Sequence, residues 1–122
     1  MPEVVAYQEA DGRVPLLDWL QGLPPVAHEL CLDRLALLRD LGHALRRPVA
    51  DYLDDGIHEL RVRHGRTRLR MLYFFHGREV VVVSHGIAKA GARVPRVEID
   101  RAIQRRWRFM SDPGRHRHPI RG

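Results

Sequence analysis

The sequence predicts an α+β fold, because two segments with helical periodicity precede three consecutive strand-like runs, and a further helical segment follows them. The chain has 122 residues, of which 44% are hydrophobic, so it can bury one core without covalent support. We expect a single domain over residues 1–110. The segment 111–122 is rich in Pro, Gly, Arg and His, and we expect it to be a disordered basic tail.

The first half of the chain is expected to contain one strand and two helices. Residues 3–7 have β-branched and aromatic character, and a helix that begins at Pro15 follows the next turn. The clearest helix covers residues 25–41, where one apolar stripe repeats at helical spacing through Ala27, Cys31, Leu35 and Leu38. The two helices would form a hairpin that covers one face of a sheet, and residues 43–56 would be a connecting loop.

The second half is expected to hold a β-meander and a final helix. Strand-like runs cover residues 57–63, 67–75 and 79–85, and short turns containing glycine separate them. The last run is continuously apolar over residues 80–83, which indicates either a central strand covered on both faces or a strand with a weakly polar outer face. A helix opened by Pro95 follows, and its expected apolar stripe consists of Ile99, Ile103, Trp107 and Met110.

Charge is segregated along the chain. Residues 1–60 hold five arginines and eleven acids, a net charge of −6, whereas residues 61–122 hold fifteen arginines, one lysine and four acids, a net charge of +12. A basic surface of this kind favours phosphate backbones through counterion release. An arginine-preferring proteome would explain the choice of arginine over lysine, but it would not explain the segregation. We therefore expect a nucleic-acid partner.

Several other classes of protein are disfavoured. The single cysteine, Cys31, excludes a disulfide within the chain, and its apolar surroundings do not suit a catalytic thiolate. No stretch approaches the roughly 18 apolar residues of a membrane helix and no leader pattern precedes residue 10, so we expect a cytoplasmic location and no membrane partner. Neither metal-ligand spacings nor phosphate-binding glycine motifs occur, so we expect no metal and no cofactor.

Alternation along two strands is expected to bring four arginines together. Arg61 and Arg63 share a face with Glu59, and a tight hairpin would place Arg63 opposite Arg68 and Arg61 opposite Arg70. Like charges across a hairpin destabilise it by some tenths of a kcal/mol per pair. Glu59 would offset part of this repulsion, and a bound phosphate would offset more, because a guanidinium makes bidentate bonds to anionic oxygens. A solvated outer sheet face is the alternative explanation.

Two further basic residues follow the third strand. His85 lies at its end and Lys89 comes four residues later, so both could approach the edge of the arginine patch. Histidine titrates near neutral pH, and cleavage of RNA needs one proton taken from the 2′-OH and another given to the leaving oxygen. Arginines would stabilise the charge that develops on the phosphorane. A lone histidine, however, is more often structural than catalytic.

Four sequence motifs occur in a fixed order: DWL to LPP over residues 18–25, GIHELRVR over residues 56–63, RLRMLYFF over residues 68–75, and HGIAK over residues 85–89 with Pro95 after it. Their order and spacing resemble the HigB-like, phage-derived branch of the RelE/ParE toxin superfamily. The resemblance covers the chain from about Pro15 to Arg108. It implies a RelE-like fold in which two N-terminal helices pack on a small antiparallel sheet and a C-terminal helix follows.

The resemblance also implies a function. Such proteins are toxins of type II toxin-antitoxin systems, and the partners implied here are a cognate antitoxin, expected to be of the helix-turn-helix type, the ribosome and mRNA. Members of this kind cleave mRNA on the ribosome without a metal. The matching catalytic positions in this sequence are Arg61, Arg70, His85 and Lys89.

The chain departs from the family pattern after its third strand. Ile87 stands where the family usually has phenylalanine, and Ala90 stands where it has a second lysine. We expect Arg93 to supply the missing charge and to contact RNA together with Arg63 and Arg68.

Two other functions stay open. A ParE-like toxin inhibits DNA gyrase through protein contact and needs no proton transfer, although the His-Gly and Lys segment favours the interferase branch. The other is an RNA-binding module without catalysis. Aromatic residues make up 7% of the chain, and the basic strands show no ordered aromatic platform, which argues against binding of single-stranded RNA by base stacking.

Overall fold

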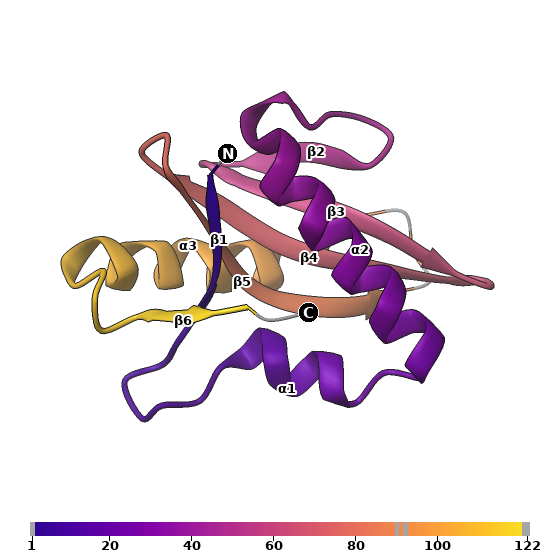
Figure 1. Cartoon of the computed structure of the whole chain (residues 1–122), viewed down its shortest axis with the longest axis horizontal. Coiled ribbons are helices and arrows are strands. Elements are labelled where there is room, and N and C mark those ends of the chain that lie inside the picture. The colour runs from indigo at the N-terminus through magenta and orange to yellow at the C-terminus, as the bar shows by residue number, and fades with distance from the viewer. Residues whose placement is uncertain (1, 90, 92, 121–122) are drawn as a thin grey trace.

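The computed structural model describes residues 2–89, 91 and 93–120, with only the backbone of Lys89. The elements, in chain order, are strand β1 (Glu3–Tyr7), helices α1 (Pro15–Gln21) and α2 (Pro25–Leu41), the 3-10 turn η1 (Gly42–Ala44), strands β2 (Ala50–Asp54), β3 (Ile57–His64), β4 (Thr67–His76) and β5 (Val80–Lys89), helix α3 (Arg96–Ser111) and strand β6 (Arg117–Pro119). This arrangement confirms the predicted α+β class (Figure 1).

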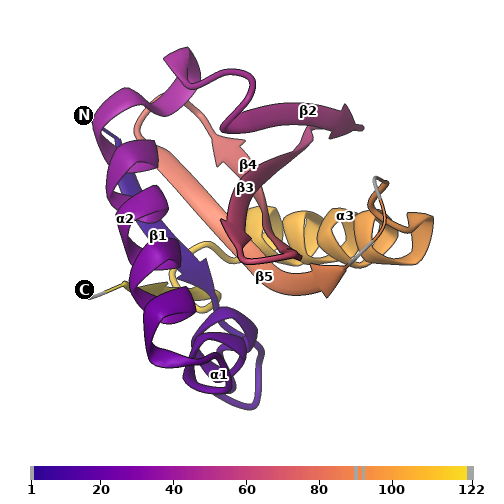
Figure 2. The ribbon, with the colours of Figure 1, turned by 90° about the vertical axis from the view of Figure 1, so that its right-hand side faces the viewer.

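The described strands form one sheet in the order β2-β3-β4-β5-β1-β6. All neighbours are antiparallel except β1 and β5, which run parallel. Figure 2 shows α1 and α2 on one face of this sheet and α3 on the other, and a separate apolar cluster fills each side. β5 therefore lies between two apolar layers, which is the first of the two alternatives that its continuous run of valines indicates.

Helix α2 packs on the sheet through the predicted stripe. Ala27, Cys31, Leu35 and Leu38 are all buried, and they belong to one apolar cluster with side chains of β3 and β4. Burial raises the pKa of the Cys31 thiol to about 11, so the thiolate is disfavoured at neutral pH. Cys31 is a core residue, as predicted.

Helix α1 and strand β5 fit together at a glycine. A Cβ atom on Gly86 would lie 2.1 Å from Cε3 of Trp19, a separation that atoms do not tolerate. Glycine at this position lets the indole ring lie directly against the backbone of β5. Two of the motifs read from the sequence, the one with Trp19 and the one with Gly86, thus meet in space.

The loop expected over residues 43–56 is in part wrong, because it contains strand β2. Ala50 pairs with Leu60 and Asp51 pairs with Glu59 along the edge of β3. Only the first residue of β2 is buried, and the strand has two acids and exposed side chains. Its strand conformation comes from backbone pairing with β3. The pattern of hydrophobic residues in the sequence does not predict such pairing.

The expectation of a disordered tail is also wrong for the residues described there. β6 pairs with β1, the imidazole of His116 stacks on Tyr7 with 5.3 Å between ring centroids, and its Nδ1 lies 2.8 Å from the carbonyl oxygen of Gln8. Ile120 packs against the cluster under α2. A histidine ring and backbone pairing hold this segment in place, although its sequence offers little apolar surface.

The apolar stripe expected for α3 is partly wrong. Ile99 is buried and Ile103 is partly buried, but Trp107 is 63% exposed and Met110 is 47% exposed. Ala102 and Phe109 are buried instead. The helix is rotated so that Arg105, which lies between these two positions, faces the sheet and its Nη2 lies 3.4 Å from Oε2 of Glu9.

Candidate functional site

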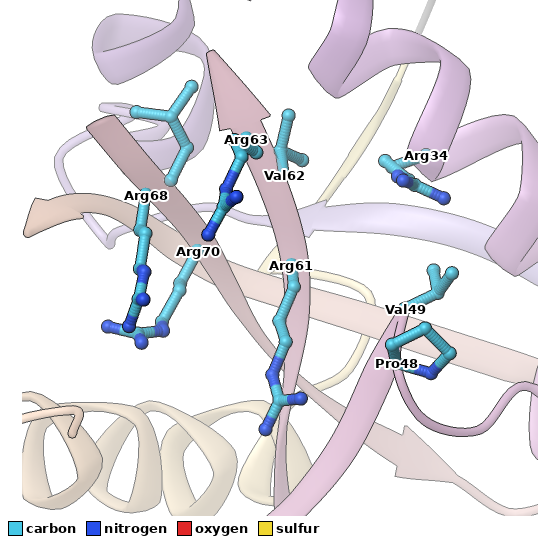
Figure 3. Close-up of a pocket in the computed structure, with 9 residues that line it drawn as sticks. Arg34, Pro48, Val49, Arg61, Val62, Arg63, Arg68 and Arg70 are labelled. Atoms are coloured by element: carbon cyan, nitrogen blue, oxygen red, sulfur yellow. The ribbon is translucent and has the colours of Figure 1, made fainter. Parts of the chain in front are cut away.

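Arginine side chains line a cavity of about 440 Å³ at the end of the β3–β4 hairpin. We call it the arginine cavity, and its lining consists of Arg34, Pro48, Val49, Arg61, Val62, Arg63, Arg68, Leu69 and Arg70. Arg61 lies directly across from Arg70 and Arg63 directly across from Arg68, which confirms the predicted register. In Figure 3 these four side chains extend to the same side of β3 and β4, whereas Arg34 lies next to α2, on the side of Val62.

A buried carboxylate holds two of these arginines. Glu59 and Arg70 are each 4% exposed, and Nε of Arg70 lies 2.8 Å from Oε1 of Glu59. The other oxygen, Oε2, lies 3.0 Å from Nη2 of Arg61, which also lies 3.2 Å from Oδ2 of Asp51. Arg70 donates a further hydrogen bond of 3.2 Å to the carbonyl oxygen of Gly91. Charge repulsion between Arg61 and Arg70 is therefore offset from within the molecule.

The remaining arginines of the cavity differ. Within the described residues, Arg34, Arg63 and Arg68 have no carboxylate at ion-pair distance. Arg63 and Arg68 are exposed, whereas Arg34 is half-buried against α2. The cavity thus combines two arginines that carboxylates hold in place, Arg61 and Arg70, with three others whose N–H donors can bind an anion.

A β-bulge determines where His85 points. Leu72 pairs with His85 while the next residue of β4, Tyr73, pairs with Val83, so Ser84 is an extra residue in β5. Without the bulge, alternation from Val83 would place His85 on the face covered by α2. The bulge turns it to the face of α3, which is also the face of Arg61 and Arg70.

Both ring nitrogens of His85 already have partners. Nδ1 lies 2.7 Å from Oγ of Ser84, and Nε2 lies 3.0 Å from Oε1 of Glu98 in α3. Burial, and next the charge of Arg105, lowers the pKa of His85 to about 4, so the ring is neutral at pH 7. Because a carboxylate only accepts, Nε2–H donates to Glu98 and the Ser84 hydroxyl donates to Nδ1.

The remaining predicted site residues are Lys89 and Arg93. Lys89 ends β5 opposite Arg68, and its side chain lies outside the described residues, as does Ala90. Arg93 is exposed in the segment that leads from β5 to α3 and is not part of the cavity lining. The structure therefore gathers Arg61, Arg63, Arg68 and Arg70 into one site. His85 lies on the same face as Arg61 and Arg70, bonds to Ser84 and Glu98, and is not among the residues that line the cavity.

Sequence reasoning missed two parts of the site. Arg34 comes from the predicted core helix, and Asp51 comes from the segment predicted to be a loop. Neither carries a motif, because each reaches the site only through the packing of distant elements. Within the described residues, no group of three His, Cys, Asp or Glu side chains is arranged to hold a metal ion.

Fold and cavity together define a class of small α+β protein with helices on both faces of a mixed sheet and an arginine-lined cavity at one end of it. Residues 18–107 match the family described as Phage derived protein Gp49-like (DUF891), so the chain belongs to this family. The family is toxin-like and belongs to the RelE/HigB context. The match extends from α1 into the last turns of α3 and includes the arginine cavity and His85. No curated protein matches the chain significantly. None of the helices in the described part is long and apolar enough to cross a membrane.

Proposed function

We propose that the protein is a HigB-like toxin of a type II toxin-antitoxin system that acts on RNA, as a metal-independent mRNA endonuclease working on the ribosome. One observation carries this proposal: four arginines of β3 and β4 extend to one side of the hairpin and line a single cavity together with Arg34 of α2, and three of the five have no carboxylate partner among the described residues. The family match supports the toxin assignment. A cognate antitoxin of the helix-turn-helix type would be the partner that silences it.

The cavity suits a ribose-phosphate chain. Arg63 and Arg68 lie side by side across the hairpin and can each donate bidentate hydrogen bonds to phosphate oxygens. Arg61 and Arg70 are already oriented by Glu59, so they need not be ordered when the substrate binds. Donors fixed in this way can stabilise the extra negative charge of a phosphorane.

Proton transfer is the more demanding part of the proposal. His85 is neutral and bonded on both sides, so it can act as an acid through Nε2 only after exchanging Glu98, or as a base through Nδ1 only after exchanging Ser84, for a substrate group. Catalytic hydrogen bonds often form only in the complex with substrate. We therefore expect His85 to exchange one of its partners for a group of the RNA when the RNA binds.

A second function, RNA binding without cleavage, is favoured by the same histidine. A ring that is 6% exposed, has a pKa of about 4 and bonds to both Ser84 and Glu98 is typical of a structural residue. In that case the protein would block translation by occupying RNA, and substitution of His85 would alter stability alone.

Induced expression in a cell without the antitoxin tests these functions. We expect growth arrest with new mRNA 5′ ends that require ribosomes, and relief of both in Arg70→Ala and His85→Ala. Because Arg70 is buried, the exposed pair Arg63→Ala and Arg68→Ala provides a variant that preserves the fold. Arg78→Ala, an exposed arginine in the turn at the other end of β4, is the matched control.

The outcomes separate the candidates. Unchanged toxicity in all the site variants contradicts the assigned site. Growth arrest with uncut mRNA, relieved by the Arg63 and Arg68 variant, indicates binding without catalysis. Growth arrest with uncut mRNA and trapped or cleaved DNA indicates a gyrase-directed toxin.

A further inference from the structure

A second cavity, of about 340 Å³, lies at the edge of the sheet beside β2. We call it the ring cavity, and the lining residues that matter here are His43, Arg46, Arg47, Asp51, Tyr52 and His58. They come from η1, β2 and β3 and from the chain between η1 and β2. His58 lies in the GIHELRVR motif but is not among the predicted site residues, and the other five belong to none of the four motifs.

Aromatic rings from four parts of the chain meet at this cavity. His43 stacks on Phe75 with centroids 3.6 Å apart and planes 15° apart. His58 stacks on Tyr73 at 5.1 Å and 18°, and Tyr52 meets His58 edge-on at 5.2 Å and 79°. Residues far apart in sequence assemble this cluster, and its exposed rings, His43 and Tyr52, come from outside the basic strands β3 and β4.

The outer rings of this cluster are open to solvent. Tyr52 is 55% exposed although it is a large aromatic residue, and His43 is exposed on top of Phe75. The hydroxyl of Tyr52 accepts a hydrogen bond of 3.1 Å from the backbone N–H of Gly56, which fixes the ring in the absence of any ligand. Burial lowers the pKa of His58, so the ring behind Tyr52 is neutral at pH 7.

The ring cavity and the arginine cavity share a wall. Oδ2 of Asp51 lies 3.0 Å from Nε of Arg47 and 3.2 Å from Nη2 of Arg61, so one carboxylate joins an arginine of each cavity. The backbone N–H of Arg61 donates to the carbonyl oxygen of Val49 at 2.7 Å. Pro48 and Val49 line the arginine cavity, and their neighbours on both sides line the ring cavity.

We propose that the ring cavity binds an unpaired base of the RNA strand whose phosphates lie in the arginine cavity. This inference rests on the proposed function, which supplies the strand. A nucleobase offers a flat face for Tyr52 and His43 and polar edges for the guanidinium groups of Arg46 and Arg47. An acidic peptide would satisfy the arginines but would leave the ring faces without a partner.

The test compares a short single-stranded RNA with an oligonucleotide of the same length that lacks its bases. We expect Tyr52→Ala to weaken binding of the intact RNA about tenfold, since loss of one base–aromatic stack has an effect of this order. Binding of the abasic strand should not change. Tyr52→Phe keeps the ring and should retain most of the affinity, although it loses the bond to Gly56.

Matched variants separate this inference from the proposed function. Trp107→Ala removes an aromatic residue of similar exposure from α3 and should leave both affinities unchanged. The double variant with Arg63→Ala and Arg68→Ala should bind both the intact RNA and the abasic strand more weakly. If it does so while Tyr52→Ala has no effect, the base site is wrong and the phosphate site stands. If no arginine variant changes the affinity for either strand, the proposed function itself is contradicted.

Two further results would also overturn the base site. If Tyr52→Ala lowered the affinity for the intact RNA and for the abasic strand equally, the residue would not contact a base. A free mononucleotide that binds as tightly as the strand, with the same dependence on Tyr52, would assign the cavity to a free nucleotide instead.

Discussion

Glu59 sets how closely the arginines of the site can lie. It is buried between Arg61 and Arg70, and its two oxygens contact one guanidinium each. Alternation along β3 and β4 was sufficient to predict the arginine patch, because a regular hairpin leaves no freedom in register. The burial of Glu59 was not predictable in the same way, since Glu59 pairs with Asp51 of β2, a strand that the sequence did not predict.

Removing this carboxylate should cost more than removing an exposed arginine. We expect Glu59→Ala to lower the free energy of unfolding by about 3 kcal/mol, because it leaves the buried guanidinium of Arg70 facing Arg61. Urea denaturation measures this, and Arg63→Ala should change it by less than about 0.5 kcal/mol. The double change of Glu59 to Leu and Arg70 to Met should recover part of the loss. A near-neutral Glu59→Ala would show that the ion pairs do not hold the site.

His85 should make stability depend on pH in a defined window. Its pKa is about 4 in the fold against 6.5 as a free group, so the unfolded chain takes up a proton that the folded chain does not. The stabilisation is fully present above pH 6.5 and is lost progressively as the pH falls towards 4. His85→Gln cannot titrate, so its unfolding free energy should vary less over this range. An identical pH profile for both proteins would contradict the buried neutral ring.

At the scale of elements, the sheet and α1 are joined where Trp19 lies on Gly86. We expect Gly86→Ala to destabilise the protein by about 2–4 kcal/mol, because the new methyl group would overlap the indole ring. Gly114→Ala, where nothing lies near the added Cβ, is the control and should be near neutral. In a double-mutant cycle with Trp19→Ala, the two effects should not add. Additive losses would mean that the glycine is needed for another reason.

The elements that sequence patterns predicted are those with strong periodicity. Helix α2 buries a stripe at helical spacing, and strands β3 and β4 bury most of their apolar residues, so the sequence patterns of these elements carry the information. Strands β2 and β6 are short edge strands whose side chains are largely exposed, and pairing with a neighbour defines them. The bulge at Ser84 is invisible in the same sense, and it reverses the face on which His85 lies.

At the scale of the whole molecule, much of the segregated charge is used internally. Acids from the first half pair with arginines from the second, as in Glu9 with Arg105, Asp51 with Arg61 and Glu59 with Arg70. Segregation along the sequence therefore overstates the basic character of the surface. At the arginine cavity, positive charge is still available to a polyanion, because Arg63 and Arg68 have no acid at ion-pair distance in the described part of the chain.

The salt dependence of RNA binding tests this central claim most directly. For a single strand, the slope of log K against log salt concentration changes by about 0.7 for each phosphate contact. We expect the protein with both Arg63→Ala and Arg68→Ala to show a slope shallower than the unchanged protein by about 1.4, and Arg78→Ala to keep the full slope. Equal slopes in all three proteins would contradict the account, because they would place the bound phosphates away from the arginine cavity.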